Sequence, residues 1–370
     1  MVYLNDIKIS NFRNYSNLNI KFSRNINIFV GDNALGKTNL IESIYVLALT
    51  KSFRPVNDIS LLKTNEISYQ LVGNIYKNDF VDELKIIYNE SGKTYFINDK
   101  KNIKNQDYLS NMNVIVFSPD DLEIIKGAPD IRRRYLNLEI VQLNSFYSKV
   151  LSDYNSLLKM RNDYLKKMKN NVKVDETYLS VLESHLINRA IYIYKTRNKF
   201  LSKISNISKD IYKKTMEKDG FNIKYVTTPH IDNFTDEEIS KLMEDSFKNN
   251  RDKEISYGST LYGPHKDDFY FMLEEENLKL IGSQSQQKLS ILVFKLAEIE
   301  LFYMQTDEYP ILLLDDIFSE LDDKRKNNVL SYLKEDIQTF ITTTDINNIN
   351  NDIVKNAKIF KISNCEITEL

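Results

Sequence analysis

The chain of 370 residues contains a single cysteine, Cys365. One cysteine excludes a disulfide framework within the chain and fits a reducing compartment. No apolar run reaches the roughly 18–20 residues that a membrane-spanning helix needs, and the first residues lack the basic and apolar regions of an export signal. We therefore expect a cytoplasmic protein with no membrane partner.

Glycine is also scarce, with nine residues in the whole chain. In so glycine-poor a sequence, each glycine is expected at a position where no side chain fits. Neither sign of charge is in large excess, because the formal net charge is -2, which alone neither demands nor excludes a polyanionic partner. The length and a hydrophobic fraction of 42% predict two domains, or one domain with a large insertion.

Two of the glycines lie in a G-x-x-x-x-G-K-[ST] motif, between a strand-like run at 26–30 and a helical apolar pattern at 40–48. Such a loop turns its backbone N–H groups toward phosphates, the helix presents its positive end, and the lysine reaches the outer phosphates. A chance match on an ordinary strand–turn–helix is the alternative, which both flanks disfavour. The expected phosphate-binding residues are Gly31, Asp32, Asn33, Ala34, Leu35, Gly36, Lys37, Thr38 and Asn39.

A second constellation consists of four apolar residues, 311–314, that end in Asp315 and Asp316. A buried strand that ends in acids places them at the carboxyl edge of a sheet, where a phosphate loop also emerges. We expect Thr38 and Asp315 to hold Mg²⁺, and Asp316 to polarise the water that attacks the γ-phosphate. Without the phosphate loop, a helix-capping pair of aspartates would be the better interpretation. The long separation of the two motifs predicts a large insertion in the nucleotide fold.

Short alternating runs predict strands before the phosphate loop and an antiparallel β subdomain at about 67–117. The turn at 11–15 carries Arg13, which either contacts a nucleotide phosphate or is a solvated turn residue. A basic loop with Lys51 and Arg54 follows the first helix. Later patterns predict a hairpin around 274–277, a helix at 286–304, strands at 310–314 and 337–343, a helix from about 322 and a final hairpin.

Residues 131–214 carry apolar positions at alternating steps of four and three, which is typical of helices that pack on each other. A polar connection at 168–175 predicts two antiparallel helices, each about 50 Å long at 1.5 Å per residue. This segment holds 18 Lys or Arg against 7 Asp or Glu, so positive charge is concentrated in it. We expect an α/β nucleotide-binding head of residues 1–128 and 255–370, with a basic, DNA-binding helical arm at 129–254 whose part from 230 is an acidic surface connection.

Three consecutive arginines, Arg132, Arg133 and Arg134, stand near the start of this arm. At a helix N-terminus, three positive charges are unfavourable because they face the positive end of the helix dipole. A contact with another group is therefore expected to offset this cost. DNA phosphates would supply such contacts, with Lys51 and Arg54 as further DNA-binding residues. An ion pair with the acidic 230s is the alternative. His265, in a glycine-bounded loop, is either a sensor or, as we favour, a structural histidine.

Two further stretches complete the pattern: 282–288, before a predicted helix, and 319–322, just after the two acids. They resemble the signature loop and the D-loop of ABC-type ATPases, whose ATP sites are shared between two subunits. Within that superfamily the chain resembles the RecF family of bacterial recombination mediators, in stretches that follow the family's order. These stretches are 11–15, 31–39, 118–122, 126–129 with 132–134, 263–268 and 312–322.

This resemblance implies a protein that binds ATP and Mg²⁺ and dimerises on ATP, with Ser283 and Gln286 of one subunit facing the γ-phosphate held by the other. It implies binding to duplex DNA at single-strand gaps, damaged forks or single-strand/double-strand junctions, hence a place on the nucleoid. It also implies assistance to RecO and RecR in loading RecA, with weak ATP hydrolysis for release. The chain departs from the pattern at Ser285, where glycine is usual, and at Lys266 and Lys288, where arginine is usual.

Two other ATPase classes fit the sequence less well. A transporter-type ABC ATPase predicts a signature loop nearer the phosphate loop and a switch histidine, where this chain has Thr342, Thr343 and Thr344. An SMC-like chromosome-structuring ATPase predicts much longer heptad rods than residues 131–214 provide. The missing switch histidine indicates slow hydrolysis, suited to switching.

Overall fold

The computed structural model describes residues 1–77, 80–101, 104–319, 326, 336–363 and 366–370. The chain forms two compact units, the first made of residues 1–122, 214–217 and 288–370 and the second of 123–213 and 218–287. Among the helices described, none is long and apolar enough to cross a membrane. The helix expected from about 322, most of the D-loop (320–322) and Cys365 lie outside the described residues.

The first unit contains a six-stranded, mostly parallel sheet in the order β15-β14-β3-β13-β12-β8. The strands β3, β13, β12 and β8 are almost entirely buried and largely apolar apart from Asn27, the threonines of β13 and Asp315, as parallel strands covered on both sides are. Because β13 pairs with both β3 and β12, the phosphate loop and the two acids emerge at one sheet edge. The strands are β3 Ile26–Val30, β8 Val114–Phe117, β12 Ile311–Asp315, β13 Thr339–Thr343, β14 Ala357–Ser363 and β15 Glu366–Glu369.

A second, antiparallel sheet of the same unit has the order β2-β1-β4-β5-β6-β7. The β subdomain predicted at about 67–117 differs from it at both ends. Residues 2–21 supply two of its strands, and 114–117 instead form β8, whose four buried apolar residues suit the parallel sheet. The strands are β1 Val2–Phe12, β2 Tyr15–Lys21, β4 Tyr69–Lys77, β5 Phe80–Asn89, β6 Gly92–Ile97 and β7 Lys100–Lys101.

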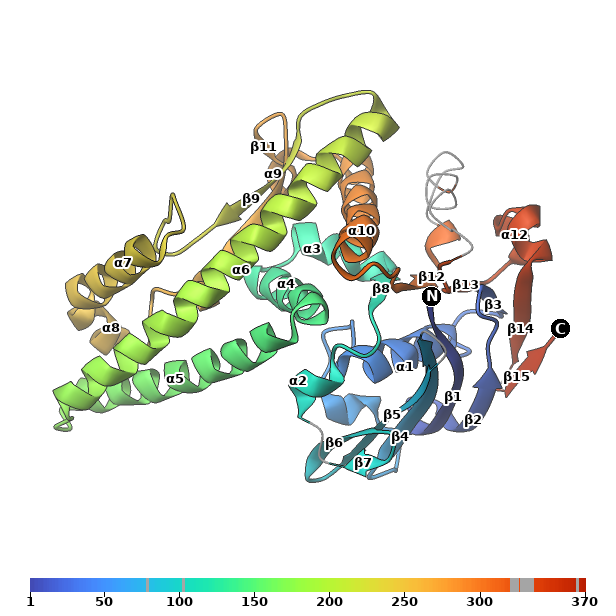
Figure 1. Ribbon diagram of the computed structural model, residues 1–370, viewed down its shortest axis with the longest axis horizontal. Coiled ribbons are helices and arrows are strands. Elements are labelled where there is room, and N and C mark those ends of the chain that lie inside the picture. The colour runs from blue at the N-terminus through green and yellow to red at the C-terminus, as the bar shows by residue number, and fades with distance from the viewer. Residues whose placement is uncertain (78–79, 102–103, 320–325, 327–335, 364–365) are drawn as a thin grey trace. The chain divides into compact units, whose positions relative to one another are not determined.

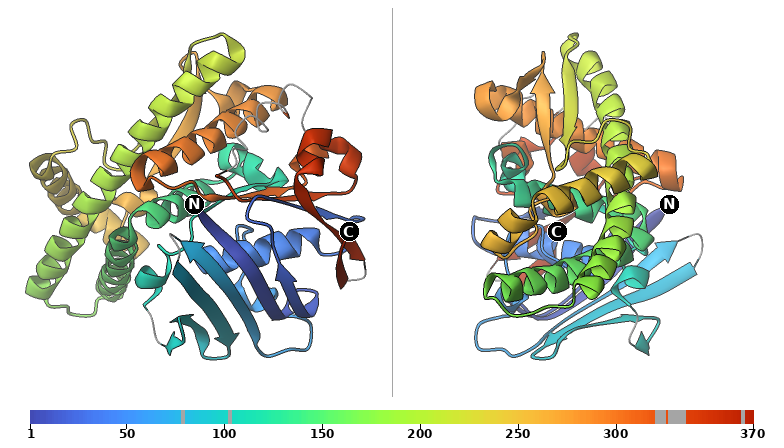
Figure 2. Two further views of the ribbon diagram at one scale, coloured as in Figure 1. Left: turned by 45° about the vertical axis from the view of Figure 1, so that its right-hand side comes forward. Right: turned by 90° about the vertical axis from the view of Figure 1, so that its left-hand side faces the viewer.

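Helix α1 (Lys37–Leu49) lies between the two sheets, as the left view of Figure 2 shows. It contacts strands of both sheets, and eleven of its residues are buried, so it has no polar face toward solvent. This burial anchors the end of the phosphate loop, Gly36 and Lys37, in the core, while residues 32–34 of the loop are exposed. Most of a second long helix, α10 (Gln284–Thr306), also lies in this unit. The remaining helices described here are short: η1 Asp58–Leu61, α2 Asn105–Tyr108, η2 Pro119–Leu122, η4 Ile317–Ser319, η5 Ile346–Asn348 and α12 Asn351–Lys355.

The second unit is built around a helical hairpin, visible in green in Figure 1. The hairpin predicted from the apolar spacing is present, but its first arm is two helices, α4 (Pro129–Leu143) and α5 (Ser145–Lys169), facing one long helix, α6 (Glu176–Met216). The break falls at Asn144, which leaves helical geometry and caps α5 by accepting a hydrogen bond from the Tyr147 N–H. An asparagine favours such caps over a helix interior.

A three-stranded antiparallel sheet, β11-β10-β9, completes this unit. The head boundary predicted at residue 255 therefore differs from the structure, because β10 pairs along its whole length with β9 and draws residues 255–287 into the second unit. The hairpin predicted around 274–277 is therefore shorter than expected, because its second strand is only residues 276–277 of the expected turn and the expected partner strand from 278 is helical. The elements are α3 Glu123–Lys126, β9 Phe221–Val226, α7 Asp236–Asn249, α8 Arg251–Tyr257, η3 Pro264–Lys266, β10 Asp268–Leu273, β11 Glu276–Asn277 and α9 Leu278–Ile281, and α10 Gln284–Thr306 begins here and continues in the first unit.

Candidate nucleotide-binding site

Lys37 opens α1 and lines a cavity of about 270 Å³ at the phosphate loop. Its ammonium donates to the carbonyl oxygens of Gly31 (2.6 Å) and Asp32 (2.8 Å). Burial lowers the pKa of Lys37, while the charges of Asp316, Asp315 and Asp32 oppose that shift. The loop thus holds a cation among backbone groups, the arrangement that the sequence motif predicts for phosphate.

The turn at 11–15, between β1 and β2, packs against this loop and supports it. The Tyr15 hydroxyl donates to the Gly36 carbonyl (3.0 Å), and the Asn39 side-chain amide donates to Asn14 (2.9 Å). Gly36 has φ 106°, and a Cβ there would lie 2.4 Å from the Asn14 amide nitrogen. Glycine is therefore required by both backbone conformation and space.

Arg13, in the same turn, does not fit either sequence-based alternative. Its guanidinium donates to both carboxylate oxygens of Glu42 (2.7 and 2.8 Å) and to the Ser60 carbonyl (2.7 Å). Glu42 lies on α1 and is fully buried. The donors of Arg13 are thus directed at protein groups, so we correct its assignment from a phosphate contact to an ion pair with a buried acid.

Arg54, which the sequence assigned to DNA, lies instead in the phosphate cavity. The loop that follows α1 turns back along the helix, because Ser52 donates to the buried Glu42 and accepts from the Arg54 N–H (2.9 Å). The Arg54 guanidinium is 3.5 Å from the Asn39 side-chain oxygen. Lys51 of the same loop is exposed. The local sequence contains no signal that this loop folds back along α1. The position of Arg54 in the phosphate cavity could therefore not be predicted from the sequence.

The two acids at the end of β12, Asp315 and Asp316, are positioned by hydroxyl groups. Asp315 accepts hydrogen bonds at one carboxylate oxygen from Thr38 (3.0 Å) and from Thr342 on β13 (2.8 Å). Burial raises the pKa of Asp315, an effect that the two hydroxyl donors oppose. The Thr342 hydroxyl also accepts from the Asp316 N–H (3.0 Å), so one buried threonine positions both acids. In the sequence, Thr342 is notable only as one of three threonines that stand where a transporter-type ABC ATPase has a switch histidine.

Thr38 and Asp315 fit a magnesium ion by the chemistry of their donors. Both present oxygen, and Mg²⁺ is usually bound through one or two protein oxygens together with substrate phosphates and water. Within the described part of the chain, no cluster of three or more His, Cys, Asp or Glu side chains could hold a metal by itself. The donor set therefore suits an ion that arrives with a nucleotide.

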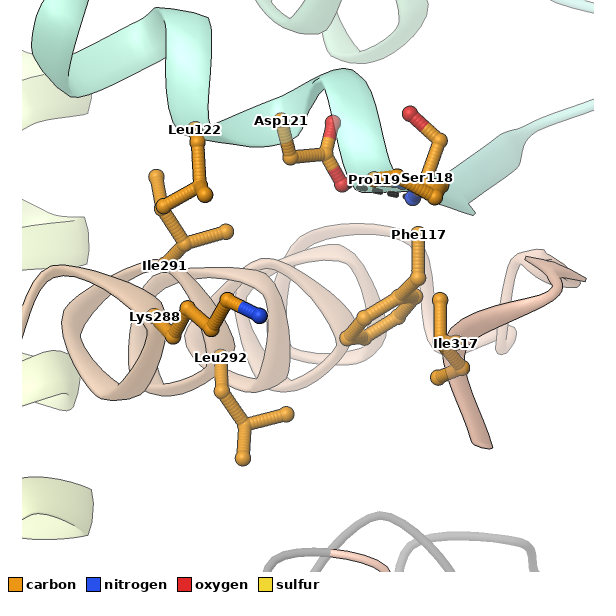
Figure 3. A pocket seen from close by; sticks show the side chains of 9 residues that line it. All are labelled: Phe117, Ser118, Pro119, Asp121, Leu122, Lys288, Ile291, Leu292 and Ile317. Carbon is orange, nitrogen blue, oxygen red and sulfur yellow. Dashed lines mark hydrogen bonds between the residues drawn. The ribbon is translucent and has the colours of Figure 1, made fainter. Parts of the chain in front are cut away.

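The stretch 118–122 forms a turn beside α10, which Figure 3 shows from close by; Ser118 is buried and the rest of the turn is partly or fully exposed. Asp121 accepts from the Ser118 N–H (2.8 Å) and lies 3.7 Å from the Lys295 ammonium. The cavity beside it measures about 60 Å³, too small for a nucleotide. We assign this motif a structural role. The cavity is lined by Phe117, Ser118, Pro119, Asp121, Leu122, Lys288, Ile291, Leu292 and Ile317.

The signature-like stretch forms the exposed start of α10. Ser283 accepts from the Gln286 N–H (3.3 Å), and Gln286 accepts from the Ser283 N–H (2.9 Å). This reciprocal pair is a capping box, which satisfies N–H groups that a helix start leaves unpaired. Both predicted contact residues are therefore present at a helix N-terminus, in the second unit.

The arginine triplet divides into different environments. Arg132 is 2% exposed and donates to both oxygens of Asp268 (2.6 and 2.8 Å), so it is a buried ion pair and we withdraw it as a DNA contact. Its partner is not the acidic 230s, whose acids at 236–238 form the first turn of α7. Arg133 is half-buried and donates to the Asp267 carbonyl (2.8 Å). Arg134 is partly exposed.

His265 is packed in the second unit as a structural histidine. Its ring nitrogens lie 2.7 Å from the Tyr154 hydroxyl and 3.0 Å from the Thr260 carbonyl. Burial lowers the pKa of His265 to about 4, so the ring is neutral at physiological pH.

Taken together, a parallel sheet with a phosphate loop, acids at its edge and an inserted helical unit define a P-loop nucleotide-binding head. The family described as "RecF/RecN/SMC N terminal domain" matches residues 3–368. A "DNA replication and repair protein RecF" from Bacillus cereus (strain G9842) is 38% identical over 373 residues, with 99% of each chain covered. The chain therefore belongs to the RecF family.

Relatives and solved structures agree with this placement. A protein of the same name from Bacillus anthracis (strain CDC 684 / NRRL 3495) is also 38% identical, again over 99% of both chains. The chain resembles "Structure of the recombination mediator protein RecF-ATP in RecFOR pathway" with a TM-score of 0.93 and 31% identity, covering 100% of this chain and 98% of that one. A Pyrococcus furiosus Smc head, at 16% identity and a TM-score of 0.53, shares the fold.

Proposed function

We propose that this chain is an ATP-gated DNA-binding protein of recombinational repair. The observation that carries the proposal is the hydrogen bond between the hydroxyl of Thr38, in the phosphate loop, and the carboxylate of Asp315 (3.0 Å). It joins a phosphate-binding loop to the acid of a strand far away in the sequence, as a nucleoside-triphosphate site requires. The structure described as RecF-ATP supports ATP as the nucleotide.

In this proposal Lys37 binds the outer phosphates, with Arg54 beside it in the same cavity. Thr38 and Asp315 hold Mg²⁺, which offsets phosphate charge and orients the triphosphate. Asp316 orients the attacking water and accepts its proton, while Thr342 keeps both acids in place. The capped start of α10, with Ser283 and Gln286, closes on the γ-phosphate from a second copy of the chain.

Hydrolysis is expected to be separable from binding. Asp316→Asn keeps the shape of the side chain but removes a proton acceptor, so the rate of hydrolysis should fall about 10²–10⁴-fold, the usual contribution of a positioned acid or base. ATP affinity should change little, and an ATP-bound dimer should accumulate. Phosphate release and analytical ultracentrifugation measure the two effects. Turnover at the parent rate would move the role to another residue.

DNA binding is proposed to lie on the basic helical unit, with Arg133 and Arg134 kept as contacts. Lys51, in the first unit, is kept as a further contact. The long helix α6 adds exposed lysines, among them Lys199 and Lys203, one helical turn apart. Phosphate contacts of this kind position a protein on duplex DNA without reading its sequence. The substrates proposed are duplex DNA at single-strand gaps, damaged forks and single-strand/double-strand junctions.

Removing two of these charges should make binding less dependent on salt. For Lys199→Gln/Lys203→Gln, the slope of log K against log salt should become shallower by about one for each DNA phosphate that the variant no longer neutralises. The matched control is Lys8→Gln/Lys21→Gln, which removes two exposed lysines from the antiparallel sheet. Fluorescence anisotropy with a duplex at several salt concentrations measures both slopes. An unchanged slope in the α6 variant would place the duplex elsewhere.

The proposed partners follow from the pathway that the descriptions of the solved relatives name. Those structures are described as recombination mediators "in RecFOR pathway". We therefore propose RecO and RecR as partners, RecA as the protein loaded through them, and a homodimer that forms on ATP and is released by slow hydrolysis.

A further inference from the structure

Glu42 is a buried acid that no step of the proposed reaction uses. Its carboxylate is fully buried on α1 and receives hydrogen bonds from Arg13 at both oxygens, and from Ser52. A buried carboxylate is costly unless it is paired and hydrogen-bonded. Arg13 supplies that pairing in the bidentate geometry that guanidinium and carboxylate groups favour.

A second arginine approaches the same carboxylate without binding it closely. The Arg54 guanidinium lies 3.8 Å from Glu42, compared with 2.7 Å for Arg13. Arg54 also lines the phosphate cavity together with Lys37, whereas Arg13 does not. One negative and two positive charges therefore meet at this point, and the more distant cation is the one that borders the cavity.

We propose that Arg13 is a charge-balancing, positioning residue that neutralises Glu42 and so leaves the charge of Arg54 to the triphosphate. This inference rests on the ATP site proposed above. Without Arg13, the buried carboxylate has no close cation, and Arg54 is the nearest replacement. At the low effective dielectric constant of a protein interior that attraction is strong, so Arg54 would turn from the cavity toward Glu42.

The test is ATP affinity, measured by titration calorimetry on the full chain in Mg²⁺ buffer. Arg54→Gln and Arg13→Gln should each weaken ATP binding about tenfold, the value of one charge-assisted hydrogen bond. Arg13→Lys, which keeps the charge, should stay within about threefold of the parent. Removing the acid as well, in Arg13→Gln/Glu42→Gln, should restore affinity to within about threefold, because Glu42 no longer attracts Arg54.

Restored ATP affinity in the double variant distinguishes charge balance from a merely structural role of Arg13. The double variant carries one more substitution than Arg13→Gln, so a purely structural defect would not be repaired by it. A double variant that binds ATP as weakly as Arg54→Gln would overturn the proposal, and this comparison holds even if Arg13→Gln alone does not fold. Arg24→Gln, at an exposed turn, controls for the change in net charge. Melting temperatures check folding of each variant. A parent protein that fails to bind ATP would refute the nucleotide site itself, before Arg13 is tested.

Discussion

Lys37→Ala is expected to lose ATP binding, with affinity at least about a hundredfold weaker than the parent. The ammonium is the cation at the centre of the phosphate cavity, within bonding distance of the loop's own carbonyls. Hydrogen bonds to a charged group contribute about 1.5–3 kcal/mol each, so the loss of two that the ammonium makes with the phosphates of bound ATP accounts for the effect. Titration calorimetry with ATP measures it.

The fold should tolerate this change. The ammonium of Lys37 donates to two carbonyl oxygens of its own loop, and the buried Asp315 keeps the hydroxyl groups of Thr38 and Thr342 as hydrogen-bond donors when Lys37 is removed. Lys8→Ala, on the exposed face of the antiparallel sheet, is a matched control. Normal ATP affinity in a well-folded Lys37→Ala protein would refute the phosphate-loop assignment.

Ser283→Arg should abolish dimerisation on ATP while each monomer still binds the nucleotide. Ser283 and Gln286 cap α10 at its exposed start. A long cation in place of Ser283 removes the capping hydroxyl and obstructs the approach of a second subunit's triphosphate. Sedimentation with and without ATP measures the dimer, and hydrolysis should fall with it. Ser180→Arg, on an exposed position of α6, controls for added bulk and charge.

Mixing the two variants tests whether the site is shared between subunits. Lys37→Ala lacks the phosphate loop's lysine but keeps the signature loop, and Ser283→Arg has the opposite defect. Their heterodimer should contain one competent site, so the mixture should recover at most half of the parent's hydrolysis. ATP-dependent dimers of Ser283→Arg alone would show that the signature assignment is wrong, an outcome to which the unusual Ser285 lends weight.

Those parts of the fold that depend on short, continuous patterns could be predicted from the sequence. The strand, glycine loop and helix around Lys37 follow each other directly, and so do the apolar run and acids at 311–316. The hairpin of α5 and α6 also follows from spacing alone. Each signal lies within one segment, so no knowledge of distant contacts is needed.

What could not be predicted depends on segments that meet only in three dimensions. Arg13 and Arg132 look like ligands for anions in the sequence, yet each pairs with a buried acid, Glu42 or Asp268. The apolar positions Ile239, Met243 and Phe247 are spaced for a helix and are buried in α7. Because charged residues surround them in the sequence, this segment is predicted as a surface connection and not as a helix. Arg54 reaches the nucleotide cavity only because its loop folds back on α1.

Thr342 has a consequence for how this position can vary. Its β-branched side chain suits a central strand, and its hydroxyl donates to one acid while accepting from the backbone of the next. Valine would keep the shape but remove the hydroxyl that both the Asp316 N–H and the Asp315 carboxylate bind. Serine would keep the hydroxyl but remove the methyl group that helps fill the sheet. Shape and chemistry thus restrict the position independently, which leaves threonine few acceptable substitutes during sequence divergence.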